Sequence, residues 1–345
     1  MFSASDVSVV IPSYNSSATI EDCLSSLLDQ EQAPLEIIVI DSSTDDTPGI
    51  IARRFPQVRM RTIKERIFPG PARNRGVSLA QGEIVAFIDA DCVAEPDWVR
   101  RIAAGHSTSP DGLPSGSGHM VVGGAVGQGN PDSQVAWAGY LGEFREFLPV
   151  GEPHYVLHLP TCNISYRKCL LQAGGGFPDA YYPQEDLLFN YMLGRQGIRI
   201  WFDPAIRIRH FCREDLRSFL SHQHRIGRVT RSTLRRLDLP GSKIARRAWL
   251  AWVSAPFLGM VKFVRTAAAF SSQFPAEALR RPALFPLLAL GTIWWARGFA
   301  AGARSGLSGI RGWNDNDPDE PIFSWIFPVS VPNSRIPAEP GPQQK

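Results

Sequence analysis

Residues 84–91 have the sequence Ile-Val-Ala-Phe-Ile-Asp-Ala-Asp, in which two carboxylates follow a run of apolar residues. A short apolar run rich in Val, Ile and Phe predicts a buried strand. Polar side chains after such a strand lie at the carboxyl edge of the sheet, where open α/β sheets bind their ligands. Because side chains at positions i and i+2 of an extended segment point the same way, we expect Asp89 and Asp91 to share one divalent cation. Carboxylate ligands suit Mg²⁺ or Mn²⁺, which usually keep substrate phosphates as further ligands.

Two solvated acids after a strand would show the same pattern, so the neighbouring elements matter. Strands are expected at residues 7–11, 36–40, 58–63 and 84–88, and helices at residues 17–30, 47–55 and 71–81. This alternation predicts an α/β fold with a doubly wound, mainly parallel sheet and right-handed crossovers. Its carboxyl edge would bring polar side chains together, namely Tyr14, Asn15, Asp41, Arg73, Asp89 and Asp91.

The rest of the chain changes character several times. Residues 106–135 are rich in Gly, Ser and Pro and are expected to form loops. Their glycines lack the spacing, after a strand and opening a helix, that a dinucleotide site needs. Residues 136–209 show mixed strand and helix patterns, and the Pro-rich tail from Asn314 onward is expected to be poorly ordered.

The bulk composition limits the class of protein. The chain has 345 residues, of which 44% are apolar and 20% charged, and this fits one large folded domain or two smaller ones. The net charge of +3 is too small to indicate nucleic acid, and we expect no nucleic-acid partner. Five cysteines without a Cys-x-x-Cys pair indicate free thiols in a reducing compartment. We expect no cleavable signal sequence at the amino terminus.

Several separated segments together resemble family 2 glycosyltransferases. In the first part of the chain they are Val-Val-Ile-Pro-Ser-Tyr-Asn (9–15), Ile-Ile-Val-Ile-Asp (37–41) with Ser-Thr-Asp (43–45), Ala-Arg-Asn-Arg-Gly (72–76) and Phe-Ile-Asp-Ala-Asp (87–91). Further on they are Gly-Gly-Phe (175–177), Glu-Asp-Leu (185–187), Gly-Ile-Arg-Ile (197–200) and Arg-Ile-Arg-His (207–210). The resemblance covers residues 6–230. It implies a GT-A fold and transfer of a sugar, with inversion, from a nucleotide-sugar donor.

The resemblance also implies a donor site with a metal. Its nucleotide-sugar-binding residues would be Pro12, Tyr14, Asn15, Asp41, Arg73, Asp89, Ala90 and Asp91. Asp91 would bind Mn²⁺ or Mg²⁺ directly, while Asp89 would reach the ribose, or the metal through water. In related enzymes a histidine at the position of His210 completes the metal site, although a lone His is also a common structural residue.

Three further residues have roles implied for the nucleotide. Tyr14 would stack on the base, Asp41 would accept hydrogen bonds from the base or ribose, and Arg73 would meet the diphosphate or the base edge. The alternatives are a helix cap for Asp41 and a helix-start charge for Arg73. The segment 41–45 is one residue shorter than is common in the family, so the residue that meets the ribose stays open.

An inverting transfer needs a base that takes the proton of the acceptor hydroxyl. Glu185 and Asp186 match the family's Glu-Asp pair at a predicted helix start, where capping is the alternative role. We expect Asp186 to be the base, with Glu185 as the alternative or as its orienting neighbour. Residues 223–228 loosely resemble a basic motif of processive relatives but lack its aromatic residue, so processivity is not expected.

Two apolar runs follow a basic segment in the last third of the chain. Residues 248–261 and 282–296 contain no charge and include four Trp, but each run is shorter than the ~20 residues that cross a bilayer. The alternatives are helices that lie in or dip into the membrane interface, a tight spanning hairpin, or a soluble helical subdomain. Basic residues at 225–247 would attract anionic headgroups. We expect a truncation after Asp238 to release a soluble protein that still binds donor.

These observations predict four regions. Residues 1–115 form a nucleotide-sugar-binding half, 116–232 an acceptor-binding half of the same GT-A domain, 233–312 a helical membrane-associating region and 313–345 a Pro-rich tail. The predicted function is metal-assisted transfer from a UDP-linked sugar to a glycan or lipid-linked acceptor at the cytoplasmic face of the cell membrane, for cell-surface polysaccharide or glycoconjugate synthesis. The alternatives are a non-catalytic membrane-bound scaffold on a transferase fold and a phosphatase with an Asp nucleophile.

Overall fold

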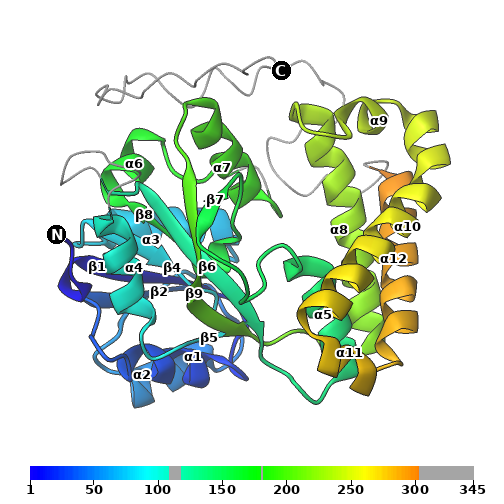
Figure 1. Cartoon of the computed structure of the whole chain (residues 1–345). Helices are drawn as coiled ribbons and strands as arrows, with labels where there is room; N and C mark the ends of the chain where they lie inside the picture. Colours follow the sequence, from blue (N-terminus) through cyan, green and yellow to red (C-terminus); the bar gives the residue numbers. More distant parts are fainter. Residues whose placement is uncertain (109–117, 180–181, 303–345) are drawn as a thin grey trace.

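One continuous sheet organises the chain. The computed structural model describes residues 1–108, 118–179 and 182–302. The nine strands of the sheet lie across the middle of the molecule (Figure 1). Their order is β3 (Arg59–Thr62), β2 (Glu36–Asp41), β1 (Val7–Ser13), β4 (Ile84–Phe87), β8 (Ile164–Arg167), β6 (Val121–Gln128), β9 (Ile200–His210) and β5 (Cys92–Ala94), with β7 (His154–Val156) also paired to β9.

The first four strands of this order are parallel, as the sequence predicts. In the register, Val9 of β1 lies beside Ile37 of β2 and Ala86 of β4. Alternate residues enter different cores, so that Val9 and Ala86 pack on one face of the sheet and Val10 and Phe87 on the other. Burial on both faces explains why β1, β2 and β4 are mainly apolar runs, whereas the edge strand β3 is largely exposed.

Beyond β4 the sheet becomes mixed. Strand β8 is antiparallel to both β4 and β6, β9 is parallel to β6, and β5 is antiparallel to β9. Because β8 pairs directly with β4, the predicted donor and acceptor halves share one sheet. The α/β fold is therefore confirmed, with one continuous parallel part formed by β3, β2, β1 and β4 and a separate parallel pair formed by β6 and β9.

Helices cover both faces of the sheet. One face carries α1 (Ile20–Leu28), α2 (Thr47–Arg54) and α4 (Trp98–Ser107), and the other carries α3 (Pro69–Leu79), α6 (Lys168–Ala173) and α7 (Glu185–Arg195). Short 3-10 helices span Ala4–Asp6 and Thr161–Asn163. Buried residues on α1 recur at helical spacing (Ile20, Leu24, Leu27), which is why this segment folds as a surface helix.

The expected loop at residues 106–135 is wrong in its second part. Strand β6 occupies a central position in the sheet, and α5 (Gln134–Phe144) begins within the same region. The glycines serve close packing: a Cβ on Gly124 would lie 1.9 Å from the carbonyl oxygen of Ile206, and a Cβ on Gly123 would lie 2.5 Å from that of Asn163. Residues 109–117 lie outside the described ranges.

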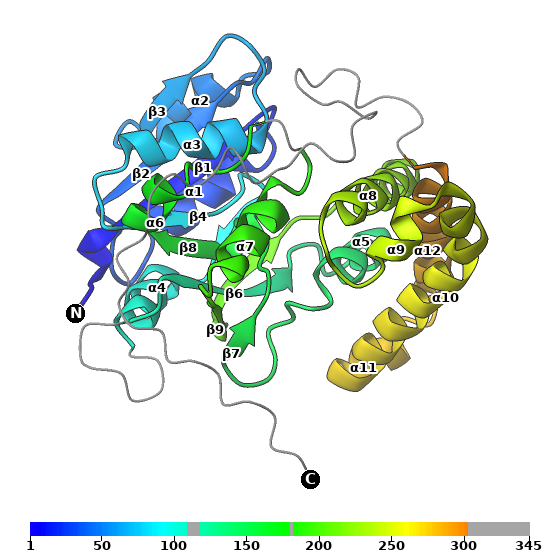
Figure 2. The same ribbon diagram turned by 90° about the horizontal axis from the view of Figure 1, so that it is seen from above.

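The carboxyl-terminal helices form a bundle beside the sheet (Figures 1 and 2). They are α8 (Leu216–Arg236), α9 (Ser242–Arg246), α10 (Ala248–Gln273), α11 (Pro275–Arg280) and α12 (Leu284–Ala301). Helix α12 packs against α8, α10 and α5. The predicted boundary at residue 232 falls inside α8, and the predicted tail from residue 313 lies outside the described residues.

Two of these helices are longer than the uncharged runs in the sequence. Helix α10 continues past Lys262 to 26 residues, and α12 continues past Arg297 to 18 residues. By length and composition alone, both helices could cross a membrane. In the apolar 18-residue segment of each helix, however, 22% of the residues of α10 and 44% of those of α12 are buried inside the protein. The helices therefore extend beyond the uncharged runs, and spanning stays one of the alternatives that the sequence offers.

Candidate active site

The two carboxylates after β4 lie in a turn and have different partners. The backbone N–H of Cys92 donates to the carbonyl oxygen of Asp89 (3.0 Å), so the chain turns between them instead of continuing as a strand. Ala90 is buried inside the turn. Asp89 Oδ1 accepts a hydrogen bond from Arg73 (2.7 Å), whereas Asp91 Oδ1 lies 3.6 Å from His210 Nε2. The predicted shared face of an extended segment is therefore wrong.

Arg73 joins the two halves of the site. It lies on α3, is only 3% exposed, and donates from Nη2 to Asp89 and from Nη1 to Glu185 Oε1, both at 2.7 Å. Burial alone would lower the pKa of Arg73, but the charges of Asp89 and Glu185 more than offset this and keep its pKa raised. A permanent buried cation thus holds the turn after β4 against the first residue of α7.

Glu185 and Asp186 begin α7 but have different surroundings. Glu185 is 4% exposed, and burial raises its pKa to about 7 against the opposing charge of Arg73. Asp186 is half-buried; its Oδ2 accepts from the Thr161 backbone N–H (3.2 Å) and hydroxyl (3.4 Å), and its Oδ1 accepts from Leu187 N–H (2.7 Å). Glu185 is engaged with Arg73, whereas Asp186 remains accessible from solvent.

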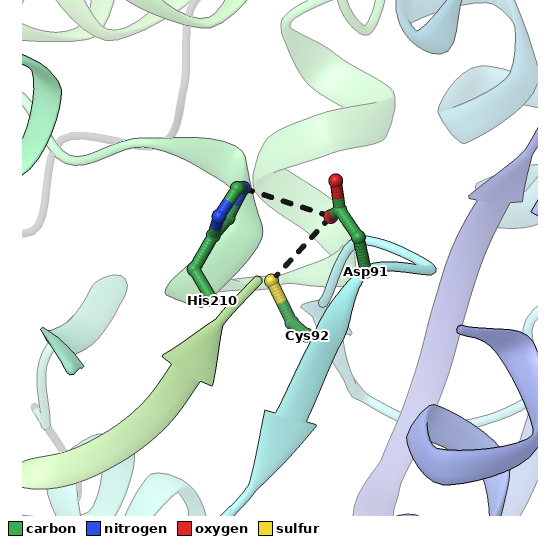
Figure 3. Close-up of side chains that lie close together, drawn as sticks. All are labelled: Asp91, Cys92 and His210. Atoms are coloured by element: carbon green, nitrogen blue, oxygen red, sulfur yellow. Dashed lines mark hydrogen bonds and ion pairs between the residues drawn. The ribbon is translucent and has the colours of Figure 1, made fainter. Parts of the chain in front are cut away.

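Asp91, Cys92 and His210 form a compact group of possible metal ligands (Figure 3). Within the described part of the chain, their donor atoms lie within 4.8 Å of one another. The group contains two of the three predicted metal ligands and adds Cys92. Asp89, the third predicted ligand, does not belong to it and faces Arg73 instead. The Asp91 side chain is 46% exposed, so the group is open to solvent.

The ends of β1 and β2 form a second part of the site. Asn15 Oδ1 accepts from the Thr44 N–H (2.8 Å), and Asn15 adopts a positive φ of 53° that few side chains tolerate. Asp41 is fully buried, and its Oδ1 and Oδ2 accept from the hydroxyl (2.7 Å) and N–H (3.1 Å) of Ser43. It therefore orders the loop after β2 and does not cap α2, which begins after Asp46.

Tyr14 is the exposed aromatic residue at this edge. It directly follows β1, in which Pro12 is buried. The guanidinium of Arg66 lies 4.2 Å from the centroid of the Tyr14 ring, a cation–π distance. A base that stacks on Tyr14 would thus meet or displace Arg66.

Sequence reasoning missed three residues at this site: Arg66, Cys92 and Thr161. Arg66 and Thr161 lie in segments without strand or helix periodicity, and no motif singled them out. Cys92 stands next to the Asp-x-Asp pattern, and this adjacency was a signal that could have been used.

Part of the chain is similar to known proteins of one family. Residues 8–148 match the glycosyl transferase family 2 model. Succinoglycan biosynthesis protein ExoO of Rhizobium meliloti is 37% identical over 115 residues, which are 31% of this chain and 33% of that protein. Glycosyltransferase AglE of Haloferax volcanii is 34% identical over 126 residues, 35% of this chain and 39% of that protein. The matched segments thus span less than half of these relatives.

A solved structure extends the similarity of the fold to most of the chain. The mannosyltransferase PcManGT from Pyrobaculum calidifontis, in complex with GDP-Man and Mn²⁺, has a TM-score of 0.55 at 19% sequence identity. The similarity covers 87% of this chain and 89% of that one. At this level of identity it shows a common fold, and the GT-A expectation is confirmed.

Proposed function

Because residues 8–148 match the glycosyl transferase family 2 model, we propose that the protein is an inverting glycosyltransferase of this family. It moves a sugar from a nucleotide-sugar donor, UDP-linked, to a glycan or lipid-linked acceptor in cell-surface polysaccharide or glycoconjugate synthesis. The observation that carries this proposal is the bridge from Asp89 through Arg73 to Glu185. It joins the segment predicted for the donor to the segment predicted for the base.

The donor is proposed to bind along the carboxyl ends of β1, β2 and β4. Tyr14 stacks on the base, and Asn15 and the loop held by Asp41 shape the ribose pocket. Asp91 and His210 would hold Mn²⁺ or Mg²⁺, and the ion would neutralise the charge that develops on the departing diphosphate. Asp89 is oriented by Arg73 toward the ribose, or toward the metal through water.

Asp186 is proposed as the general base. A base must be accessible to the acceptor hydroxyl and ionised before it takes the proton. Asp186 is half-buried at the start of α7, and hydrogen bonds from Thr161 and Leu187 hold its carboxylate in place. Glu185 is less suited because it is buried and bound to Arg73.

A membrane surface is proposed as a partner of α10. One face of this helix carries exposed, large apolar side chains, which we call the α10 stripe: Trp249, Trp252, Val253, Phe257, Met260 and Val264, each 56–69% exposed. Exposed Lys243, Arg246 and Arg247 lie directly before α10 and would attract anionic headgroups by ~1 kcal/mol each. An apolar face with adjacent cations is typical of a helix at a bilayer interface.

The side of α10 opposite the stripe contacts the rest of the protein, which favours a helix that lies on the membrane surface over one that crosses the bilayer. Lys262 Nζ donates to the carbonyl oxygen of Gly142 on α5 (2.7 Å), and Arg265 pairs with Glu146 (3.0 Å). Helix α12 is in turn packed on the Arg-rich helix α8. One side of α10 therefore belongs to the protein, which supports placing the α10 stripe in the cytoplasmic interface beside a lipid-linked acceptor.

The experiment is a thermal-shift screen of the full chain with nucleotide sugars, with and without Mn²⁺. A donor should raise the melting temperature in proportion to RT ln(1 + [L]/Kd), and only in the presence of metal. Asp91→Asn should remove the Mn²⁺-dependent part of the shift, whereas Leu157→Ala, at an exposed residue outside the site, should leave it unchanged. The proposal fails if no nucleotide sugar stabilises the parent protein.

A further inference from the structure

We propose that the sulfur of Cys92 is a third protein ligand of the metal at Asp91 and His210, so that this site binds thiophilic ions such as Zn²⁺ and Co²⁺ more tightly than Mn²⁺ or Mg²⁺. The inference rests on the metal site of the proposed function and adds the ligand that decides which ion it prefers.

The fold places Cys92 beside His210 by strand pairing. Strand β5 begins at Cys92 and β9 ends at His210, and the two residues are direct partners in the antiparallel register. Side chains of direct partners leave the same face of a sheet and come close together. The turn that contains Asp91 then directs its carboxylate onto the same spot, and Figure 3 shows the sulfur and the imidazole both facing Asp91 Oδ1.

The distances match those of three ligands around one ion. Bonds of about 2.0 Å for Zn–O and Zn–N and about 2.3 Å for Zn–S place O and N about 3.3 Å apart, and O and S about 3.5 Å apart, in a tetrahedron. In the structure, Asp91 Oδ1 lies 3.6 Å from His210 Nε2 and 3.8 Å from Cys92 Sγ. Shifts of about 0.3 Å would bring each of these two pairs to the ideal spacing. The donor atoms of the third pair, His210 and Cys92, lie within 4.8 Å of each other.

The imidazole is held in the orientation that a ligand needs. His210 Nδ1 lies 3.4 Å from Cys212 Sγ, and the ring packs on Phe144 with 4.9 Å between the centroids. These contacts leave Nε2 facing Asp91. A metal-bound histidine usually has its second nitrogen engaged in this way.

Sulfur changes which ion the site selects. Mg²⁺ and Mn²⁺ prefer oxygen ligands, while thiolate favours Zn²⁺ and related ions, which also lie higher in the general affinity order of divalent metals. The thiol proton leaves to solvent when the ion binds. Cys92 is fully buried, so the sulfur approaches the ion from behind and leaves the exposed side of Asp91 open to a diphosphate.

Cobalt spectroscopy on the full chain tests the ligand without any variant of Cys92. Co²⁺ added to the metal-free protein, with no nucleotide, should produce a thiolate-to-cobalt charge-transfer band in the near ultraviolet. Cys169→Ser, which removes an exposed cysteine outside the group, should keep the band. A cobalt complex without this band in the parent protein would overturn the proposal.

Competition between ions provides the second test. Zn²⁺ should displace Mn²⁺ from the parent protein, as measured by the paramagnetic resonance signal of free Mn²⁺. Cys92→Ser should weaken Zn²⁺ binding by at least ~10-fold while Mn²⁺ binding changes by less than ~3-fold. Cys92→Ala replaces this variant if its thermal unfolding shows that the serine is not tolerated. Equal loss for both ions means a structural role for Cys92 and overturns the proposal. Because these measurements use metal ions without a nucleotide sugar, they test the Cys92 proposal even if no donor binds in the thermal-shift screen.

Discussion

Two adjacent carboxylates divide their tasks because their surroundings differ. Glu185 is enclosed with Arg73, whereas Asp186 is half-buried and accepts hydrogen bonds from Thr161. The cation therefore supports the position of α7 through Glu185 and does not engage Asp186, the residue proposed as the base. The sequence shows only a Glu-Asp pair, in which either residue could have been the base.

Asp186→Asn tests this division. The amide keeps the size of the side chain but cannot take a proton, so transfer should slow by at least ~100-fold while donor affinity stays within about 3-fold of the parent. Single-turnover transfer and donor titration measure the two effects. The assignment is wrong if Glu185→Gln reproduces this kinetic pattern and Asp186→Asn does not.

Glu185 also makes stability depend on pH. Its folded-state pKa of about 7 lies above its ordinary value of 4.5, so between these limits the folded protein binds a proton that the unfolded chain has lost. The free energy of unfolding should therefore decrease as pH rises from 4.5 to 7, by up to roughly 3 kcal/mol. Urea titrations across this range should show a flatter dependence for Glu185→Gln. If the free energy of unfolding changes with pH to the same extent in the parent and in Glu185→Gln, the raised pKa of Glu185 is contradicted.

The partners of Arg73 show where prediction from sequence stops at the residue scale. A basic residue near the carboxyl edge was predicted correctly, and its contact with Asp89 spans only 16 positions. The contact with Glu185 spans 112 positions and depends on how α3 and α7 pack on the sheet. Local pattern contains no information about that packing, so the bridge could not be predicted.

At the scale of elements, periodic segments were predictable and the glycine-rich strand was not. The strands and helices from Val7 to Phe87 lie close to where apolar spacing indicates, whereas β5 and α4 were not predicted. Strand β6 has glycines at 123, 124 and 127, which remove the apolar alternation that marks a strand. Its place in the sheet follows from close contacts with β8 and β9, which appear only in three dimensions.

Gly124 and Gly127 form a matched pair on β6. A Cβ at Gly124 would lie 1.9 Å from the Ile206 carbonyl oxygen. A Cβ at Gly127 would have the Ile208 carbonyl oxygen as its nearest neighbour, at 3.2 Å. Gly124→Ala should lower the free energy of unfolding by about 3 kcal/mol or more because backbone must move. Gly127→Ala should cost less than about 1 kcal/mol. Equal stability of the two variants in urea unfolding would disprove the close contact.

The α10 stripe makes a prediction about membrane binding. Burial of a large apolar side chain contributes roughly 1.5–3 kcal/mol, so a double variant, Trp249→Glu with Trp252→Glu, should weaken vesicle binding by at least ~100-fold. Flotation with phosphatidylglycerol-containing vesicles measures this. Leu157→Glu, at a residue that is 84% exposed elsewhere, is the matched control and should bind like the parent. Unchanged binding of the double variant would remove α10 as the membrane-binding element.

For the whole molecule, the carboxyl-terminal helices share a hydrophobic core with the sheet domain. The ring of Trp137 on α5 lies 5.8 Å from that of Phe270 on α10, and Phe219 on α8 shares the same core with Leu284 and Leu288 on α12. Close packing of α8 with α12 depends on Gly227, because a Cβ there would lie 2.0 Å from the Trp295 carbonyl oxygen. The sequence presents these helices as a separable anchor, since apolar runs with basic flanks do not reveal which side faces protein.

A truncation after Asp238 therefore has a different expected outcome from the soluble, donor-binding fragment that the sequence suggests. Removing Phe270, Leu284 and Leu288 uncovers the core faces of α5 and α8. At roughly 1.5–3 kcal/mol for each buried side chain, the loss of about 5–9 kcal/mol is comparable to the entire stability of a typical domain. The truncated chain should aggregate, or unfold at a much lower temperature than the full chain, as followed by light scattering during thermal unfolding. A soluble monomer with an unchanged transition would show that the helices are an appendage, and the acceptor would then have to be positioned by the sheet domain alone.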